Sequence, residues 1–154
     1  MRKAPPRGFE LSEFERRMSR VQRVMHDRSI DAILQTTEPD VRYFSGFHTQ
    51  FWESPTRPWF LVLPREGKPI AVIPGIGAAG MRATWVDDIR TWHSPQPDDD
   101  GISMLADALS SLTTKSNRIG VPLGHESLLR MPAGDYQVLR DRLSGIEIVD
   151  VATE

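Results

Sequence analysis

Two apolar runs near the middle of the chain constrain the fold more than any other feature. Residues 59–63 and 69–73 are almost entirely hydrophobic, and a turn that contains Gly67 separates them. Paired runs of this length around a glycine-containing turn are typical of a β-hairpin. The chain is therefore expected to contribute an antiparallel pair of strands to its sheet.

Helical patterns and short apolar runs alternate around this predicted hairpin. Apolar residues recur at helical spacing between Ser12 and Met25, more weakly at 76–83, and again at 102–112 and 133–143. Short apolar runs typical of strands lie at 30–35, 89–92, 119–121 and 146–151. Alternation of this kind predicts a partly parallel sheet that helices cover. Together with the hairpin, it predicts a three-layer α/β/α domain around a mixed sheet of five or six strands.

Local patterns give three more detailed expectations. Ser12 and Glu15 have the spacing of a capping box at the start of the first helix. Residues 36–40 indicate a turn, which is followed at 41–44 by a short strand or helical turn. A run of arginines on the first helix is typical of a solvated helix face; it comprises Arg16, Arg17, Arg20, Arg23 and Arg28.

Length and composition limit the kind of protein this is. The 154 residues fit one domain, which we place at residues 9–151 after a flexible leader at 1–8. The absence of cysteine excludes disulfides and thiolate metal sites, and it makes the cytoplasm the default location. A net charge of -2 without a basic face argues against nucleic acid as a partner. No apolar run approaches the roughly 20 residues of a transmembrane helix, so we expect no membrane partner.

Motifs that carry catalysis are missing from this sequence. The four histidines, His26, His48, His93 and His125, include no pair at the i,i+4 spacing of a helical metal site, and the sequence contains neither an HExxH nor a GxSxG motif. We therefore predict no catalytic residue and no metal ligand here. Residues 75–80 do match GxGxxG between a strand and a helix, which leaves a nucleotide-binding domain as an alternative. The competing interpretation is a glycine-rich helix start that packs closely on the sheet.

An aromatic loop, residues 47–58, is the most unusual segment. It combines a histidine and an arginine with Phe51 and Trp52, and Trp59 follows it directly. In one interpretation the aromatic side chains fill the core beneath the loop. In the other, Trp52 and Arg57 line an interface or a ligand pocket, because Arg offers a planar fork suited to carboxylates and both residue types anchor interfaces.

The residues that lead into the aromatic loop resemble a known family. Residues 38–47, Glu-Pro-Asp-Val-Arg-Tyr-Phe-Ser-Gly-Phe, are similar to the tyrosine–glycine signature in the N-terminal domain of creatinase, prolidase and aminopeptidase P. The preceding Ser-Ile-Asp-Ala-Ile-Leu of residues 29–34 also resembles the family's strand, and the resemblance extends over about residues 9–151. It implies a domain with a ribonuclease H-like motif.

The resemblance also implies that the chain is part of a larger metal-dependent hydrolase, either an Xaa-Pro peptidase or a creatinase-type enzyme that cleaves C–N bonds. The catalytic C-terminal domain would be absent from this chain, and with it the two divalent metal ions. The implied partners are this missing domain, a second copy in a homodimer, and a small amide, dipeptide or guanidino substrate. A binding or oligomerisation module without hydrolase activity stays open as the alternative.

Site residues follow from the same resemblance. In creatinase-like members, an aromatic residue and an arginine from the loop after the signature reach into the active site of the partner subunit. Arg57 takes the position of that arginine, and Trp52 or Phe51 takes the position of the aromatic residue. We assign His48, in the same loop, to the predicted substrate pocket as well.

Overall fold

The computed structural model describes residues 8–54, 57–113 and 115–153. Six strands form one sheet in the order β4-β3-β2-β1-β5-β6. The strands are β1 (Ala32–Gln35), β2 (Phe60–Pro64), β3 (Ile70–Pro74), β4 (Asp88–Trp92), β5 (Arg118–Val121) and β6 (Glu147–Asp150). The predicted hairpin is the antiparallel pair β2–β3, and β1 runs antiparallel to β2 and parallel to β5. The expectation of a mixed sheet with up to six strands is confirmed. Residues 1–7 of the predicted leader lie outside the described residues.

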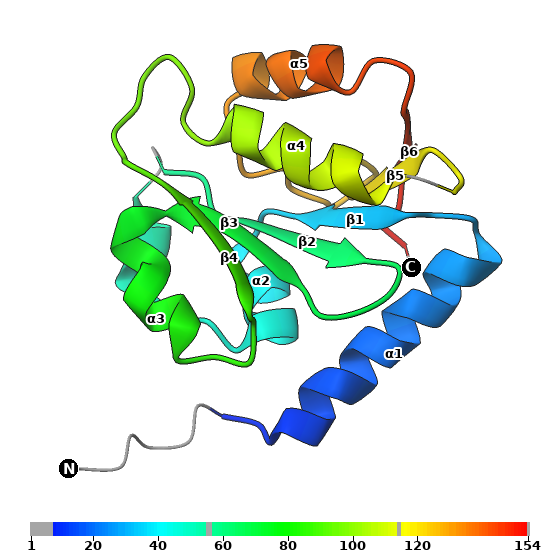
Figure 1. Cartoon of the computed structure of the whole chain (residues 1–154), viewed down its shortest axis with the longest axis horizontal. Coiled ribbons are helices and arrows are strands. Elements are labelled where there is room, and N and C mark those ends of the chain that lie inside the picture. The colour runs from blue at the N-terminus through cyan, green and yellow to red at the C-terminus, as the bar shows by residue number, and fades with distance from the viewer. Residues whose placement is uncertain (1–7, 55–56, 114, 154) are drawn as a thin grey trace.

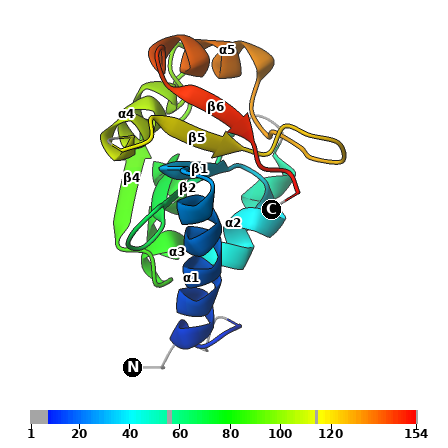
Figure 2. The same ribbon diagram turned by 90° about the vertical axis from the view of Figure 1, so that its right-hand side faces the viewer.

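Helices cover both faces of the sheet, as a three-layer fold requires (Figure 1). On one side lie α1 (Leu11–Asp27), α2 (Glu38–Ser45) and α3 (Ala78–Arg82), and on the other lie α4 (Ile102–Leu112) and α5 (Ala133–Arg142). Figure 2, turned by 90°, shows α4 and α5 above the sheet and α1 extending below it. Two short 3-10 helices, η1 (Gln50–Glu53) and η2 (Gly75–Gly77), complete the fold.

Alternation along the central strands divides the core into two layers. Ile33 of β1 packs with α1, α2 and α3, whereas its neighbours Ala32 and Leu34 pack with α4 and α5. In β2, Leu61 and Leu63 face the first layer, and Phe60 and Val62 face the second. Successive side chains of a strand point to opposite faces, so a continuous apolar run indicates a strand that is buried on both sides.

Polar residues at the start of β1 tie the sheet to its connections. Asp31, which is buried, accepts hydrogen bonds through Oδ2 from the backbone N–H groups of Ser116 and Asn117, both at 2.8 Å. Arg65 lies on the other carboxylate oxygen, with Nη1 3.5 Å from Oδ1. These contacts fix the entry to β5 beside the entry to β1.

The start of α1 differs from the predicted capping box, which was wrong. The helix begins at Leu11, one residue before the expected start, and the residue at its N-cap is Glu10, whose side chain makes no capping hydrogen bond. Ser12 is therefore already inside the first turn. Glu15 therefore lacks the N-cap hydroxyl that a capping box requires.

Residues 36–40 do not form the predicted turn, because most of them belong to α2. Thr37 is the N-cap, and its hydroxyl oxygen accepts from the backbone N–H of Asp40 at 3.4 Å. Pro39 lies in the first turn, where its missing N–H costs no hydrogen bond. The helix ends at Ser45, and the C-cap residue Gly46 has a φ of 73°, in the left-handed region that glycine adopts easily.

Arg17 contradicts the expectation that the arginines of α1 all lie on a solvated face. Its side chain is 8% exposed and its Nε donates to Glu13 Oε1 at 2.8 Å. Nη1 donates to the carbonyl oxygen of Tyr43 at 2.6 Å. The guanidinium also lies 4.2–4.3 Å from the ring centres of Tyr43 and Phe9, within the range of cation–π attraction. Arg17 therefore joins α1 to α2.

The glycine-rich segment after β3 packs against aromatic rings. A Cβ added at Gly77 would lie 2.2 Å from Cζ3 of Trp59, and one at Gly80 would lie 3.0 Å from Cε2 of Phe47. Both rings are buried. Two of the three glycines of the GxGxxG match thus have a packing role, which favours the close-packed helix start over a phosphate cradle.

Replacing Gly77 by alanine should therefore destabilise the fold. Because the buried Trp59 ring has no room to withdraw, we expect a loss of about 1–3 kcal/mol in the free energy of unfolding, measured by urea denaturation followed by circular dichroism. Gly134→Ala is the control, since a Cβ there meets nothing within 4 Å. It should be neutral or stabilise by up to about 1 kcal/mol. Equal stabilities for the two variants would contradict the packing argument.

Candidate functional site

The carboxyl ends of three parallel strands, β1, β5 and β6, lie at one edge of the sheet, which we call the carboxyl edge. Ligands of open α/β sheets commonly bind outside such an edge. A depression of about 650 Å³ lies there between the start of α2, the segment after β5 and the residues after β6. Its polar lining includes Gln35, Thr37, Asp40, His125 and Glu126.

Asp150, the last residue of β6, organises the backbone at this edge. Its Oδ1 accepts hydrogen bonds from the N–H groups of Leu123 at 2.8 Å and of Gly124 and Ala152 at 3.0 Å. These bonds, led by that from Leu123, hold the pKa of the Asp150 carboxyl below its usual value. Gly124 fits closely here, since an added Cβ would lie 2.5 Å from Asp150 Oδ2.

The described part of the aromatic loop, residues 47–54 and 57–58, lies beside the carboxyl edge because it leads into β2, which pairs antiparallel with β1. Trp52 is 8% exposed, and its ring centre is 5.8 Å from that of the fully buried Trp59. Phe51 is half-buried against the same core layer. The loop aromatics therefore fill the core, as the first interpretation expected. Among the described residues, the buried indole N–H of Trp52 has no hydrogen-bond partner.

Arg130, in the segment between β5 and α5, holds this loop. Its Nη1 donates to the carbonyl oxygen of Arg57 at 2.7 Å. Its Nη2 donates to the carbonyl oxygens of Trp52, at 3.2 Å, and of Ser54. The guanidinium carbon lies 5.1 Å from the centre of the Trp52 ring. Burial lowers the pKa of Arg130, and the nearby charge of Glu38 opposes that change.

Sequence reasoning missed Arg130. It lies in a segment without helical or strand periodicity, and its partners are 73 to 78 residues away along the chain. No local pattern marks such a residue.

The structure places the other predicted site residues in two groups. Phe51, Trp52 and Arg57 belong to the part of the loop that Arg130 holds, and Arg57 is half-buried. His48 is more exposed and lies near the start of α2, with Nδ1 3.7 Å from Glu38 Oε1. It borders a separate pocket of about 360 Å³, together with Gly8, Phe9, Phe14, Arg42 and Gly46.

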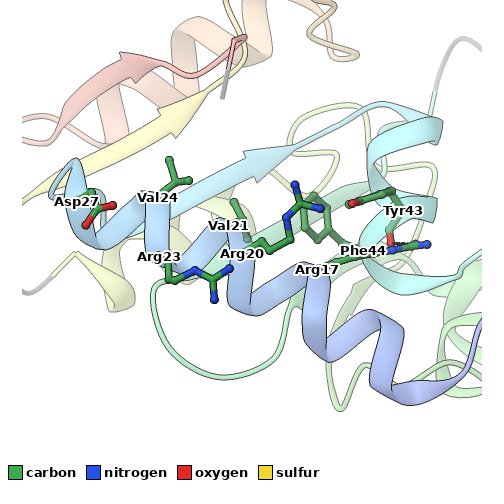
Figure 3. Close-up of a pocket in the computed structure, with 8 residues that line it drawn as sticks. All are labelled: Arg17, Arg20, Val21, Arg23, Val24, Asp27, Tyr43 and Phe44. Atoms are coloured by element: carbon green, nitrogen blue, oxygen red, sulfur yellow. Dashed lines mark hydrogen bonds between the residues drawn. The ribbon is translucent and has the colours of Figure 1, made fainter.

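A further groove of about 430 Å³ lies between α1 and α2 (Figure 3). Its lining is formed by Arg17, Arg20, Val21, Arg23, Val24, Asp27, Tyr43 and Phe44. Figure 3 shows Arg17 directed at the Tyr43 carbonyl, whereas Arg20 and Arg23 are exposed. None of the predicted site residues lies in this groove.

Metal-binding clusters and membrane-spanning helices are both absent from the described ranges. No cluster of three or more His, Cys, Asp or Glu side chains there has the arrangement of a metal site. Nor does any described helix combine the length and apolar character needed to cross a membrane.

Comparisons with known proteins agree with the fold. A family model described as the creatinase/prolidase N-terminal domain matches residues 17–154. A search of curated proteins gives no match.

Three solved structures illustrate the likeness. Dipeptidase PepE from Mycobacterium ulcerans has a TM-score of 0.66 and 24% identity, over 92% of this chain but 35% of its own. A proline dipeptidase from Streptococcus agalactiae 2603V has a TM-score of 0.69 and 14% identity, over 90% and 95% of the two chains. The creatinase/prolidase N-terminal domain of an X-Pro dipeptidase from Streptococcus pyogenes has a TM-score of 0.67 and 12% identity, over 88% and 93%.

Acidification should weaken the hydrogen bonds that the Asp150 carboxylate accepts at the carboxyl edge. Its lowered pKa means that the carboxylate supports the fold fully above the ordinary Asp value of about 3.9 and loses this effect as the pH falls through the lowered value. We expect the exchange protection of the Leu123, Gly124 and Ala152 amides to fall in that acid range, as measured by NMR. In Asp150→Asn these amides should be less protected already at neutral pH. Asp98→Asn, in an exposed loop, is the control; equal protection in the wild type and Asp150→Asn would refute the role of Asp150.

Proposed function

Because this chain belongs to the family of creatinase/prolidase N-terminal domains, we propose that it is the non-catalytic N-terminal domain of a metal-dependent hydrolase. The observation that carries this proposal is the family match over residues 17–154. The shared fold of a domain from an X-Pro dipeptidase adds support. The chain spans 35% of the M. ulcerans dipeptidase, which is the proportion expected of one domain in a larger enzyme.

The reaction of the whole enzyme would be hydrolysis of a C–N bond, in an Xaa-Pro peptide or in a creatinase-type substrate. Two divalent metal ions in a C-terminal catalytic domain would lower the pKa of the attacking water. The chain described here would contribute shape and charge to the substrate pocket. We further propose a cytoplasmic location, in keeping with the lack of cysteine.

The aromatic loop is the part of this domain that we propose contacts substrate. Arg57 would bind a carboxylate of a small amide, dipeptide or guanidino substrate, because a guanidinium presents two parallel N–H donors to the two carboxylate oxygens. Phe51, which is half-buried, would form the apolar wall next to it, and Trp52 would support that wall from the core. His48 would contact substrate from its own, separate pocket. The location of the loop beside the carboxyl edge supports this assignment.

Assembly into a homodimer would bring this loop to the active site of the partner subunit, and the domain's own C-terminal domain would be a second partner. Exposed apolar side chains support such contacts. Leu123 is 43% exposed and Leu128 is 63% exposed, both in the segment after β5 at the carboxyl edge. Apolar groups that gather on a surface commonly mark an interface with protein.

Arg57→Ala in the two-domain enzyme should raise KM. Loss of a charge-assisted contact of about 1.5–3 kcal/mol corresponds to an increase of about 10- to 100-fold, measured by steady-state kinetics with Xaa-Pro dipeptides and with creatine. Arg57→Lys should recover part of the loss, because it keeps the charge without the planar fork. Arg90→Ala, on the far edge strand β4, is the control. If Arg57→Ala leaves the kinetics unchanged, Arg57 does not bind the substrate.

The 154-residue chain by itself should not turn over substrate. We expect no release of proline from an Xaa-Pro dipeptide above the blank without protein, with Mn²⁺ present, because the residues of the proposed metal pair belong to another domain. Turnover that depends on added metal would overturn the non-catalytic assignment. Full activity on adding a separately expressed C-terminal domain would exclude the alternative of an independent binding module.

A further inference from the structure

One side chain connects the sheet to the part of the aromatic loop that carries Arg57. The three carbonyl oxygens that Arg130 binds belong to Trp52, Ser54 and Arg57, so a single guanidinium spans six residues of the loop. Its guanidinium carbon also lies 5.1 Å from the centre of the Trp52 ring, within the range of cation–π attraction. Both the backbone and an aromatic side chain of the loop are therefore in contact with Arg130.

Arg130 is itself held by the sheet. Its backbone N–H donates to Oγ1 of Thr36 at 2.9 Å. Thr36 is buried and follows directly after β1, the strand at the centre of the sheet. A continuous path of hydrogen bonds therefore runs from β1 through Thr36 and Arg130 to Arg57.

Two kinds of hydrogen bond hold the described part of the loop: local bonds within η1, and bonds from Arg130 to Trp52, Ser54 and Arg57. The 3-10 turn η1 is formed by short-range bonds, from Phe51 N–H to Thr49 Oγ1 at 3.3 Å and from Ser54 N–H to the Phe51 carbonyl at 3.1 Å. At Arg57 the backbone oxygen is bound from another segment of the chain, at 2.7 Å. The orientation of the Arg57 backbone therefore depends on Arg130.

The chemistry of this contact requires arginine. A guanidinium carries five N–H donors in a rigid plane, which lets it bind several carbonyl oxygens and stack on a ring at once. Lysine has one ammonium group on a flexible stem and cannot reproduce this geometry. Within the described residues Arg130 forms no ion pair with a carboxylate, so the cost of burying its charge is offset by carbonyl dipoles and by the negative charge of Glu38.

We propose that Arg130 is a positioning residue for the aromatic loop, and that it sets the place of Arg57 in the substrate pocket. The proposal rests on the proposed function of Arg57. It adds a residue that touches no substrate itself but on which substrate binding depends. The loop conformation is then a property of this domain and is established before any partner subunit binds.

Hydrogen exchange tests the first half of the proposal on the 154-residue chain. In Arg130→Gln, the amides of residues 52–58 that are observable should exchange at least about tenfold faster than in the wild type, because the loop opens locally without global unfolding. Arg130→Lys should behave in the same way, although it keeps the charge. Arg118→Gln is the matched control: Arg118 is also half-buried and also binds a backbone carbonyl, that of Arg28 at 2.6 Å, far along the chain from the loop. Loop exchange that is unchanged in a folded Arg130→Gln overturns the proposal.

A double-mutant cycle in the two-domain enzyme tests the second half. Arg130→Gln alone should raise KM by about the same 10- to 100-fold as Arg57→Ala, with a smaller effect on kcat. In the Arg57→Ala background, Arg130→Gln should change KM less than about threefold, because residues that act as a unit are not additive. A general loss of stability would instead give multiplied effects, and that result overturns the action of Arg130 through Arg57.

The two experiments separate the proposal from its premise. If Arg57→Ala leaves KM unchanged while Arg130→Gln still accelerates exchange in the loop, the proposed function of Arg57 fails and the support of the loop by Arg130 stands. If Arg57→Ala raises KM while Arg130→Gln affects neither exchange nor KM, the proposed function stands and the positioning role is refuted.

Discussion

The structure depends on the central strand β1, which joins two differently built halves of the sheet. It pairs antiparallel with β2 of the hairpin and parallel with β5, and its residues are buried on both faces. Polar residues stand immediately before and after it. Asp31 binds the N–H groups that lead into β5, and Thr36 binds the N–H of Arg130. A strand of four residues therefore fixes the core layers and also the connections at both ends.

The hairpin, the alternation of helices and strands, and the mixed sheet could all be predicted from the sequence, because each follows from local periodicity. Residues 41–44 were predicted as a short strand or a helical turn, and they are helical; the first turn of helix α2 was missed for a different reason. Thr37, Pro39 and Asp40 are turn formers, and the same residue types also begin a helix, where threonine caps and proline fits the first turn. The local sequence allowed both structures, and the packing of Val41 and Phe44 into the core distinguishes them.

The arginines show which contacts could not be predicted from the sequence. Arg17 and Arg20 belong to the same helix, yet Arg17 is buried because Tyr43 and Phe9 surround it and Arg20 is exposed. Arg130 binds oxygens of a segment more than 70 residues away. Helical periodicity describes a helix in isolation, so it does not report partners that come from elsewhere. The segment that carries Phe51, Trp52 and Arg57 could be singled out from the sequence, but the residue that holds this segment could not.

The contact between Arg130 and three carbonyl groups also bears on the entropy of binding. A free loop of this kind would lose backbone freedom when a ligand orders it, and each ordered residue costs about 1–2 kcal/mol. Here Arg130 holds the carbonyl groups of Trp52 and Arg57 when the chain folds, so the backbone at these two residues need not be ordered in the binding step. Under the proposed function, a ligand of this segment would meet a preorganised surface, and its affinity would depend on the contacts made more than on the ordering of the backbone.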